Sequence, residues 1–415
     1  MSTKNVNRHD YKLTAIGWIP KEWKCVKLGD LVSIVSGNSP SVYQPTEGGK
    51  YPFVKVDDMN LTYIWQDRAR QYTDVAINAV PSDSILFAKR GAAIETNKVR
   101  IAKVPLTMDS NMMALVSHKI FHHYLYYQIV FKNLWKIADT STIPQINNKH
   151  IIPLRIPLPS LVEQRRIAAI LSTWDQAIDQ TRRLLDACKR RKKVLMQKLL
   201  IGEWRFPEFG KPVHVGELPG GWTMVCLGDV ASLVTGVGFP MALQNQKGLS
   251  LPFFKVGNLG DVDSGQILST SDHTISPETA ATLGAKIIPK NAVAFAKIGM
   301  AIVLNRRRLI GQPSCIDNNM MATVPTNKIV PGFLLSFLET IDFMPLAQAT
   351  TVPSLRKEDL ENIELLLPPL SEQEKIVSLL SAVNAEIGIL QKSLEKLQLQ
   401  KRGLMQKLLT GEIRV

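Results

Sequence analysis

The chain contains two copies of one sequence pattern, and this repeat limits the possible folds more than any other feature. Its last segment, Leu404 to Val415 (LMQKLLTGEIRV), matches Leu195 to Phe206 (LMQKLLIGEWRF) at nine of twelve positions. A Pro-x-x-Trp element and a Leu-Gly-Asp triplet recur near the start of each copy, at Pro20 to Asp30 and at Pro219 to Asp229. Self-similarity with a period of about half the length indicates two copies of one structural unit.

Three more segments repeat inside the copies, and one stretch between them does not. PFVKV begins at Pro52 and recurs as PFFKV at Pro252. FAK, with a glycine two residues after the lysine, begins at Phe87 and at Phe295. DSNMMA begins at Asp109 and recurs as DNNMMA at Asp317. The stretch from Asp57 to Leu86 shares few residues with Gly257 to Ala294 and differs from it in length. This pattern favours two like domains that recognise different targets, although free drift of exposed loops after duplication explains it equally well.

Each copy divides into a mixed domain and one long helix. Short apolar runs such as Ser84 to Lys89, glycine and proline punctuation and one helical stretch are typical of a mixed α/β (α+β) domain. Prolines precede each helix, and Ser160 with Glu163 forms a capping-box pattern, which the second copy shows two positions later at Ser371 and Glu374. We predict a leader over 1–18, mixed domains over 19–159 and 207–368, and helical spacers over 160–206 and 369–415.

The two long helices carry apolar heptads. Apolar residues alternate in steps of four and three over nearly five heptads, which is typical of a coiled-coil seam rather than of an ordinary surface helix. The predicted seam contains Ile167, Leu171, Trp174, Ile178, Leu185, Leu195, Ile376, Leu380, Val383, Ile387, Leu394 and Leu404.

A lysine interrupts the seam at the same heptad position in both helices, Lys192 and Lys401. Parallel helices in register would bring the two ammonium groups face to face, a like-charge clash. In an antiparallel pair, Lys192 lies level with Val383 and Lys401 with Trp174. We therefore predict two domains related by a pseudo-twofold axis and separated by a long antiparallel two-helix coiled coil.

The composition favours a polyanionic partner. The chain has 50 Lys and Arg against 36 Asp and Glu, a formal net charge of +14, and nucleic acid is the leading candidate. Its four cysteines form no C-x-x-C pair, which fits a reducing cytoplasm. The most apolar stretch, Ile329 to Leu346, is broken by acidic residues and prolines, and the first ten residues lack a secretion signal, so we expect no membrane partner and a cytoplasmic location.

The usual motifs of DNA-modifying enzymes are missing from the sequence. It has no Asp-Pro-Pro, Asn-Pro-Pro or Pro-Cys element for base methylation, and no G-x-x-x-x-G-K-[ST] loop for ATP. The nearest candidate for a metal site, Asp57-Asp58 beside Lys55, becomes Gly257-Asn258 in the second copy. We therefore expect no catalytic residues, no metal site and no cofactor bound by this chain.

Candidate DNA contacts come from the repeated basic turns and from the hydroxyl-rich segments that precede each long helix. Cations, hydroxyls and backbone N–H groups of these kinds contact phosphate, although an ordinary hairpin end or a helix cap has the same composition. The aromatic run from Phe121 to Trp135 has helical spacing and is better explained as a core helix than as a base-stacking platform. The DNA-binding candidates are Lys89, Arg90, Asn111, Thr140, Thr142, Lys149, Lys297, Asn319, Thr350, Thr351, Arg356 and Lys357.

The proline-rich segments LPSLVEQRRIAAIL (158–171) and LPPLSEQEKIVSLL (367–380), each followed by a long helix and an LMQKLLTGE-type ending, resemble the specificity subunits of type I restriction-modification systems. The resemblance covers nearly the whole chain. It implies two target-recognition domains, each reading one half of an asymmetric bipartite sequence in double-stranded DNA. It also implies helical regions that dock two methyltransferase subunits and the restriction/translocase subunits.

In that family the catalytic activities belong to the partner chains. The resemblance implies adenine-N6 methylation with S-adenosylmethionine and type I site-specific deoxyribonuclease activity with ATP and Mg²⁺, none of them carried by this chain. Two alternatives stay open: a stand-alone bivalent DNA-binding regulator, and a coiled-coil scaffold with protein or carbohydrate ligands. Exposure of Leu199-Leu200 and Leu408-Leu409 would favour docked partners over the regulator.

Inserting four residues into one long helix should change the tolerated gap between the half-sites or abolish DNA binding, because the paired helices set the separation of the two domains. The gap is measured by mapping methylated or bound sequences for the altered chain. An unchanged gap would show that the helices do not set the spacing.

Overall fold

The computed structural model describes residues 8–260, 266–348 and 352–415, which form two compact units. Unit 1 comprises Met1–Thr181 with Leu394–Val415, and unit 2 comprises Arg182–Ser393. Each unit therefore combines one mixed domain with the beginning of its own long helix and the end of the other copy's helix. Among the described residues, no helix is long and apolar enough to cross a membrane.

The two units contain the same five-stranded sheet. In unit 1 the order is β4 (Val32–Ser36), β11 (Met112–Ser117), β8 (Ile85–Ala88), β9 (Val99–Ala102) and β6 (Trp65–Gln66). In unit 2 it is β14 (Ala231–Thr235), β21 (Met320–Pro325), β18 (Val293–Ala296), β19 (Arg307–Ile310) and β16 (Ile267–Leu268). Only the last pair of each sheet is parallel. The mixed α/β prediction is thus confirmed, and the match in strand order shows that the copies share one fold.

A smaller three-stranded sheet accompanies each large one. In unit 1, β5 (Tyr51–Val54) lies between β10 (Thr107–Met108) and β7 (Gln71–Thr73); in unit 2, β15 (Leu251–Phe254) lies between β20 (Cys315–Ile316) and β17 (Thr274–Ile275). The first and last strands of each domain pair with each other: β3 (Lys24–Lys27) with β12 (Arg155–Leu158), and β13 (Thr223–Cys226) with β22 (Glu364–Leu367). Because these two strands pair, the chain enters and leaves each domain at the same place.

One short helix lies in the stretch where the two copies differ most. The short helices are α1 (Pro40–Tyr43), α2 (His122–Lys132) and α3 (Asn148–Ile151) in unit 1, and α5 (Leu227–Val230), α6 (Pro277–Thr282), α7 (Pro331–Thr340) and α8 (Lys357–Glu361) in unit 2. Helix α6 lies in the stretch that makes the second copy longer. Ser276 caps it by accepting a hydrogen bond from the backbone N–H of Thr279, and Pro277 occupies its first turn.

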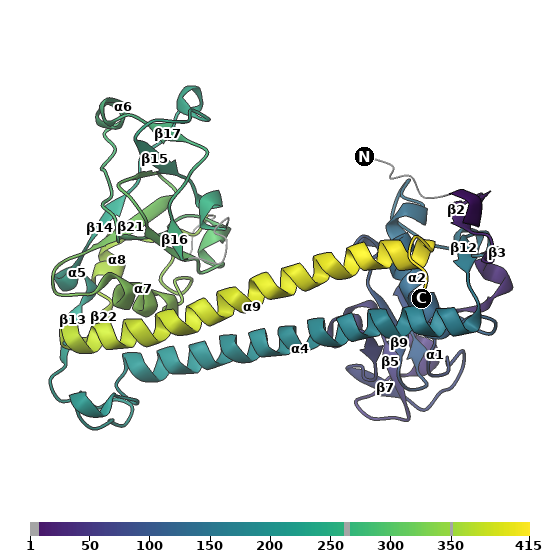
Figure 1. The fold of residues 1–415 in the computed structure, drawn as a ribbon. Coiled ribbons are helices and arrows are strands. Elements are labelled where there is room, and N and C mark those ends of the chain that lie inside the picture. The colour runs from purple at the N-terminus through teal and green to yellow at the C-terminus, as the bar shows by residue number, and fades with distance from the viewer. Residues whose placement is uncertain (1–7, 261–265, 349–351) are drawn as a thin grey trace. The chain divides into compact units, whose positions relative to one another are not determined.

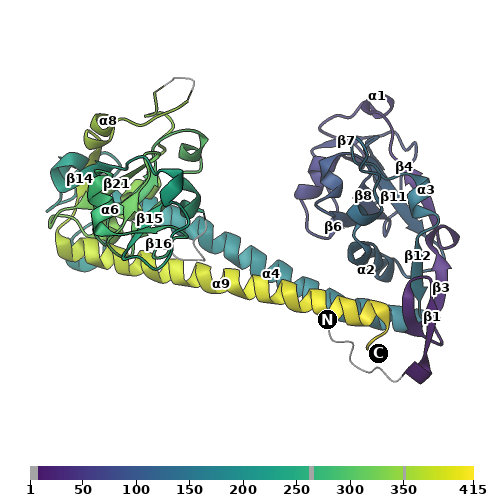
Figure 2. The same cartoon turned by 90° about the horizontal axis from the view of Figure 1, so that it is seen from above.

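Helix α2 and its counterpart α7 join each sheet to the long helices. Tyr124 and Tyr127 of α2 are buried in the core, so the core-helix interpretation of the aromatic run is correct. The helix contacts β8 and β9 and lies between the large sheet of unit 1 and the long helices (Figure 2). Gln128 donates a hydrogen bond to the carbonyl of Leu409, at 3.2 Å. In unit 2, α7 contacts β18 and β19 and lies beside α9 (Figure 1). Its Glu339 accepts from Lys192 at 2.9 Å.

The long helices are α4 (Leu161–Leu200) and α9 (Leu370–Thr410), and within each unit their segments are antiparallel. In unit 1, Asp175 pairs with Lys401, and Glu163, earlier in the chain, pairs with the later Arg414. In unit 2, Cys188 contacts Glu386, and the later Arg205 contacts the earlier Glu372. The predicted orientation is confirmed, and Lys401 lies beside the residue that follows Trp174, as the predicted register requires.

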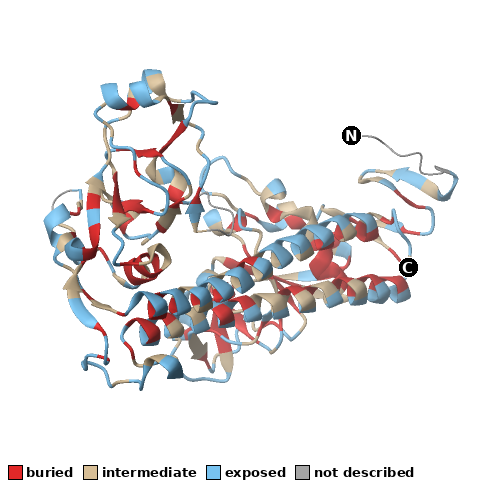
Figure 3. Ribbon diagram, turned by 60° about the vertical axis from the view of Figure 1, so that its left-hand side comes forward, coloured by how far each residue is buried: buried red, intermediate tan, exposed pale blue. Residues whose placement is uncertain are grey.

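The predicted seam residues are all buried or half-buried. Figure 3 shows buried positions recurring along both helices. Buried are Ile167, Leu171, Ile178, Leu185, Ile376, Leu380 and Val383, and half-buried are Trp174, Leu195, Ile387, Leu394 and Leu404. Two pairs at the helix ends, Leu199-Leu200 and Leu408-Leu409, are buried in the cores of units 2 and 1. They therefore pack inside this chain and provide no argument for a docked partner.

The two seam lysines are neutralised by different elements. Lys401 donates to Asp175 of α4 at 2.5 Å, and the hydroxyl of Tyr127 donates to the other oxygen of that carboxylate at 2.7 Å. The position equivalent to Asp175 in copy two is Asn384, which cannot neutralise a lysine. Lys192 instead pairs with Glu339 of α7. A polar position inside an apolar seam is tolerated because each ammonium group has a carboxylate partner.

The leader packs against the chain's own C-terminal segment. Residues Tyr11–Thr14 (β1) and Gly17–Pro20 (β2) form an antiparallel hairpin. The hydroxyl of Tyr11 donates to the carbonyl of Gly411 at 2.8 Å. The described part of residues 1–18 therefore joins unit 1 as a strand pair rather than as an unattached leader.

Replacing Asp175 with Ala should destabilise unit 1 by about 3–5 kcal/mol, because the ammonium group of Lys401 would stay in the seam without its carboxylate. Glu339→Ala is the matched control for unit 2, and it should cost less because water reaches both Lys192 and Glu339 more readily. Urea denaturation of the full chain, followed through both units, measures the difference. Equal losses for the two variants would contradict the burial argument.

Candidate nucleic-acid interface

The repeated polar segments meet at the same place in each unit. In unit 1 the backbone N–H of Lys89 donates to the carbonyl of Asn111 at 2.8 Å. In unit 2 Lys297 donates in the same way to Asn319 at 2.9 Å. This contact joins the end of the FAK strand to the turn of the DSNMMA or DNNMMA segment, so segments that are separate in sequence form one edge.

A buried aspartate fixes the turn in both units. The backbone N–H of Asn111 donates to Oδ1 of Asp109 at 3.0 Å, and Asn319 does the same to Asp317 at 3.1 Å. Burial raises the pKa of Asp109, and the attraction of Lys55 and Lys89 opposes that rise. The two aspartates therefore shape a turn beside basic side chains and belong to its framework.

The close approach of a neighbouring strand end requires glycine at this turn. A Cβ atom on Gly37 would lie 2.0 Å from the carbonyl oxygen of Asp109, and one on Gly236 would lie 1.9 Å from that of Asp317. Neither distance is possible without moving the backbone. The residue after each glycine forms a β-bridge to the aspartate: Asn38 to Asp109 in unit 1, and Val237 to Asp317 in unit 2. Each bridge can form only because the glycine before it has no side chain.

The basic turn also pairs with the segment that follows the candidate threonines in the sequence. Gly91 donates to the carbonyl of Pro144 at 2.8 Å, and Ile146 donates to that of Lys89 at 2.8 Å. The equivalent bonds in unit 2 join Gly299 to Pro353 at 2.7 Å and Leu355 to Lys297 at 2.9 Å. In unit 1 the structure therefore brings the basic turn and the hydroxyl-rich segment, predicted as separate DNA-binding groups, onto one edge. In unit 2 the described residues of that edge are the basic turn and Pro353 to Leu355.

The candidate contacts differ in exposure along this edge. Lys89, Asn111, Lys297 and Asn319 are half-buried, and burial lowers the pKa of Lys89. Exposed are Arg90, Thr140, Thr142, Lys149, Arg356 and Lys357, with Lys357 paired to Glu361 at 3.2 Å. Thr350 and Thr351 lie outside the described residues. Contact of these residues with DNA stays a prediction.

Two further basic residues belong to the same neighbourhood although they were not predicted as contacts. The Nζ of Lys55 donates to Gln71 at 2.8 Å, and that of Lys255 donates to Gln244 at 3.1 Å. Their signal in the sequence was the exact repetition of a lysine inside an otherwise apolar strand segment, PFVKV and PFFKV.

The acidic pair nearest to a metal-site pattern, Asp57-Asp58, has a structural role. The carboxylate of Asp58 accepts from the backbone N–H of Lys55 at 2.9 Å and of Arg70 at 3.3 Å, so it caps a turn. Asn258 makes the same bond to Lys255 in unit 2, at 2.8 Å, without any charge. Among the residues that the structure describes, no three His, Cys, Asp or Glu side chains gather as metal ligands would.

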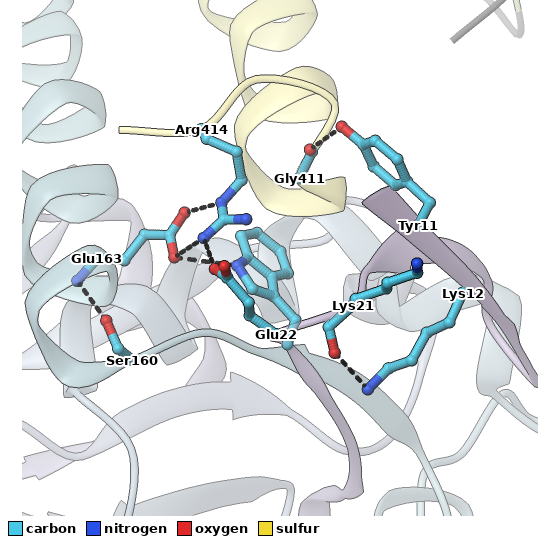
Figure 4. A network of polar contacts seen from close by, with 9 residues as sticks. Tyr11, Lys12, Lys21, Glu22, Ser160, Glu163, Gly411 and Arg414 are labelled. Carbon is cyan, nitrogen blue, oxygen red and sulfur yellow. Dashed lines mark hydrogen bonds and ion pairs between the residues drawn. The ribbon is translucent and has the colours of Figure 1, made fainter. Parts of the chain in front are cut away.

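A second set of repeated residues fastens the long helices to the domains. In unit 1 the indole N–H of Trp23 donates to Glu163 at 3.0 Å, and Nε of Arg414 donates to the same carboxylate at 2.5 Å (Figure 4). Arg414 also donates to Glu22, at 2.7 Å. We call this group, Trp23 with Glu163 and Arg414, the unit 1 clasp. It explains why the helix that ends the chain belongs to the first domain.

Unit 2 has the equivalent group, the unit 2 clasp. Trp222 donates to Glu372 at 2.8 Å, and Arg205 donates to both oxygens of that carboxylate at 2.9 and 2.8 Å. The Arg205 and Glu372 side chains are only 3% and 1% exposed, whereas Arg414 is 40% exposed. The arginine of each clasp comes from the repeated ending of the opposite copy.

The unit 1 clasp corrects the capping box predicted at Ser160 and Glu163. The hydroxyl of Ser160 accepts from the backbone N–H of Glu163 at 3.3 Å, but the carboxylate of Glu163 turns to Trp23 and Arg414. In copy two the equivalent residue is Glu372, inside the first turn of α9, and Glu374 is exposed. In copy one the S-x-x-E pattern marks the helix start, but its glutamate acts in tertiary packing and not in a reciprocal cap. In copy two the pattern at Ser371 and Glu374 falls inside α9, and the residue that acts in tertiary packing is Glu372.

The glutamine that follows each clasp glutamate also connects helix and domain. Gln164 accepts from the backbone N–H of Phe121, just before α2, at 2.9 Å, and donates to the carbonyl of Pro159 at 2.9 Å. Gln373 accepts from Val330, just before α7, at 2.7 Å. Because these N–H groups have no partner within their own helices, the Glu-Gln dipeptide orients α2 and α7 against the long helices.

Comparison with known proteins agrees with this architecture. A family model described as a type I restriction modification DNA specificity domain matches residues 20–190 and 219–399. The type I restriction enzyme MjaIX specificity subunit of Methanocaldococcus jannaschii is 26% identical over 436 residues, covering 98% of this chain and 97% of that protein.

Two solved structures share the fold. The S subunit of a type I restriction-modification system from M. genitalium has a TM-score of 0.58 at 17% identity, covering 96% of this chain and 98% of that one. A chain from a structure on complex assembly and conformational transition of a type I R-M system has a TM-score of 0.55 at 20% identity, covering 95% and 99%.

Glu372→Ala should destabilise unit 2 by about 3–5 kcal/mol, because Arg205 would remain buried without a counter-charge. Arg414→Ala should cost unit 1 less, about 1 kcal/mol, since its guanidinium is partly solvated and Trp23 continues to satisfy Glu163. Glu374→Ala, two residues from Glu372 and exposed, serves as the neutral control. Thermal unfolding of the three variants checks the order; a Glu374 variant as unstable as the Glu372 variant would refute it.

Proposed function

The chain belongs to the family of type I restriction-modification DNA specificity domains, and from this premise we propose that it reads an asymmetric bipartite DNA sequence, one half-site per unit. As a type I specificity subunit it is the DNA-recognition component of its system. The finer division of labour rests on the duplication: the same strand order and the same polar edge occur twice, whereas the loops around that edge differ.

The single observation that carries the proposal is the repeated polar edge. In each unit a lysine at a strand end, a buried aspartate with its asparagine, and a backbone pairing to a proline-containing segment, Pro144 to Ile146 or Pro353 to Leu355, occur together. Basic and hydroxyl groups on a chain of +14 net charge provide attraction to the phosphate backbone, which is independent of sequence. Base edges are then read by the residues that differ between the units.

We propose that catalysis belongs to partner subunits in the cytoplasm. This chain would hold no cofactor, and the methyltransferase partners would use S-adenosylmethionine for adenine-N6 methylation. The restriction/translocase partners would use ATP and Mg²⁺ for cleavage. Two methyltransferase subunits per chain would follow from the two copies.

The long helices offer surfaces for such partners. Leu161 and Leu370 occupy the same position in the two copies, at the first turn of α4 and α9, and both are exposed. Val194 of α4 and Ile389 of α9 are exposed as well. Exposed apolar residues on helices favour protein contact, and so they favour an assembled complex over a stand-alone DNA-binding regulator.

Exchanging residues 20–158 for the corresponding domain of a relative, with Trp23 kept, should change one half of the recognised sequence and leave the other half unchanged. The unit 1 clasp and the long helices remain intact in this chimera. Mapping methylated adenines in genomic DNA from cells that express the chain with its methyltransferase gives both halves directly. A change in both halves would argue against one half-site per unit.

The parent chain serves as the control in the same experiment. It should co-purify with the methyltransferase subunit and yield a bipartite methylated sequence. Full sequence-specific binding by the chain alone, with no co-purifying methyltransferase, would instead support the regulator.

A further inference from the structure

A seven-residue loop follows the repeated basic turn in both units and has the same framework in each. The loops are Gly91 to Asn97 (GAAIETN) and Gly299 to Asn305 (GMAIVLN). Both begin with a glycine at positive φ, +85° and +76°, and both end with an asparagine in the left-handed region, at 46° and 51°. We call them the unit 1 loop and the unit 2 loop.

The framework residues are anchored in the same way. Ile94 and Ile302 are both fully buried below the loops. The side-chain amide of Asn97 donates to the carbonyl of Val130 at 2.9 Å, and that of Asn305 donates to the carbonyl of Ile341 at 3.1 Å. These contacts hold the loops against α2 and α7, so both should present their outer residues in the same orientation.

The three positions at which the loops differ are their exposed positions. The unit 1 loop shows Ala92, Glu95 and Thr96 to solvent. The unit 2 loop shows Met300, Val303 and Leu304 instead, 71%, 48% and 56% exposed. Because none of these side chains fills the core, the change from an alanine, a glutamate and a threonine to three large apolar residues has no packing explanation. Adjacent exposed apolar side chains of this size mark a contact surface.

The surroundings of the unit 2 loop indicate which partner it contacts. Lys297 lies two residues before Gly299, and the exposed Arg306 follows Asn305 directly. Gly299 is bonded to Pro353, so the loop starts on the edge that also carries Arg356. The loop itself contains no acidic residue. An apolar patch bounded by cations fits a DNA groove, where phosphates lie on both sides of the base edges.

We propose that the unit 2 loop reads its half-site by apolar contact with thymine methyl groups in the major groove, whereas the unit 1 loop reads its half-site through Glu95 and Thr96. The thymine C5-methyl group is the one apolar group that a base pair presents in the major groove, and carboxylates and hydroxyls there pair with base amino groups instead. This inference rests on the proposed function and assigns a base chemistry to it.

The test compares the parent chain with the triple variant Met300→Ser, Val303→Ser and Leu304→Ser, each in complex with the methyltransferase. The replacements are exposed, neutral and smaller, so the thermal midpoint should not change. The target is first identified by mapping methylated adenines. Duplexes with that target, with thymines of the unit 2 half-site replaced by deoxyuridine, then serve as the probe.

For the parent complex, each contacted thymine that loses its methyl group should weaken binding by about fourfold. The triple variant should bind the thymine duplex more weakly and show no further loss with deoxyuridine. Its affinity for DNA without the target should stay as in the parent. Deoxyuridine in the unit 1 half-site is the matched control and should have no such effect.

The reciprocal variant, Ala92→Met, Glu95→Val and Thr96→Leu, keeps the test informative because it adds the apolar set to unit 1. It should alter the bases accepted in the unit 1 half-site alone. Unchanged target sequences for both variants, or a parent complex insensitive to deoxyuridine, would overturn the inference while leaving the bipartite proposal standing. A triple variant that no longer binds the methyltransferase would also overturn it, by assigning the patch to a protein partner. A parent complex without any bipartite target would remove the proposed function itself.

Discussion

The architecture depends on a carboxylate that two parts of the chain share. Glu163 and Glu372 each stand in the first turn of a long helix and bind a tryptophan from the start of their own copy and an arginine from the end of the other copy. Neither unit can be completed by one copy alone in this chain. The buried Arg205 and Glu372 must pair, because either charge without the other would remain in a medium that solvates it poorly.

The same principle explains the lysines in the helix seam. A charged residue at a seam position costs stability unless a counter-charge meets it, and it therefore selects the arrangement that provides one. Here the arrangement is antiparallel, and the two lysines use carboxylates from different elements, Asp175 of α4 and Glu339 of α7. Although the copies are alike, the polar contacts that fix their helices are not: the carboxylate beside Lys401 stands on a long helix, whereas the one beside Lys192 stands on a helix of the unit 2 domain.

The sequence predicted what depends on periodicity and repetition. Heptads gave the seam, and the like-charge argument on Lys192 and Lys401 gave the antiparallel orientation. It could not identify Glu339 as the partner of Lys192, because that contact depends on how α7 packs on the sheet. Glu163 was assigned to a cap because its local pattern is that of a cap, while its partners Trp23 and Arg414 lie 140 and 251 residues away. The repeated residues of the polar edge can be found from the sequence. That they lie close together cannot, because it depends on pairings between strands that are far apart in the sequence.

In this fold the residues that hold the backbone are separate from the residues that we propose to read the DNA. In the loops after Lys89 and Lys297, the glycine, isoleucine and asparagine that fix the backbone are the same in both units, and only outward side chains differ. Substitutions at exposed positions usually change stability by less than about 0.5 kcal/mol, whereas changes at the buried isoleucines would cost several times more. If the outward side chains read the target as we propose, target preference could change at these positions without a change in the clasps or the seam. Each unit could then change its target independently, because the loops take their support from their own sheet and helix, and the clasps keep both domains attached to the long helices.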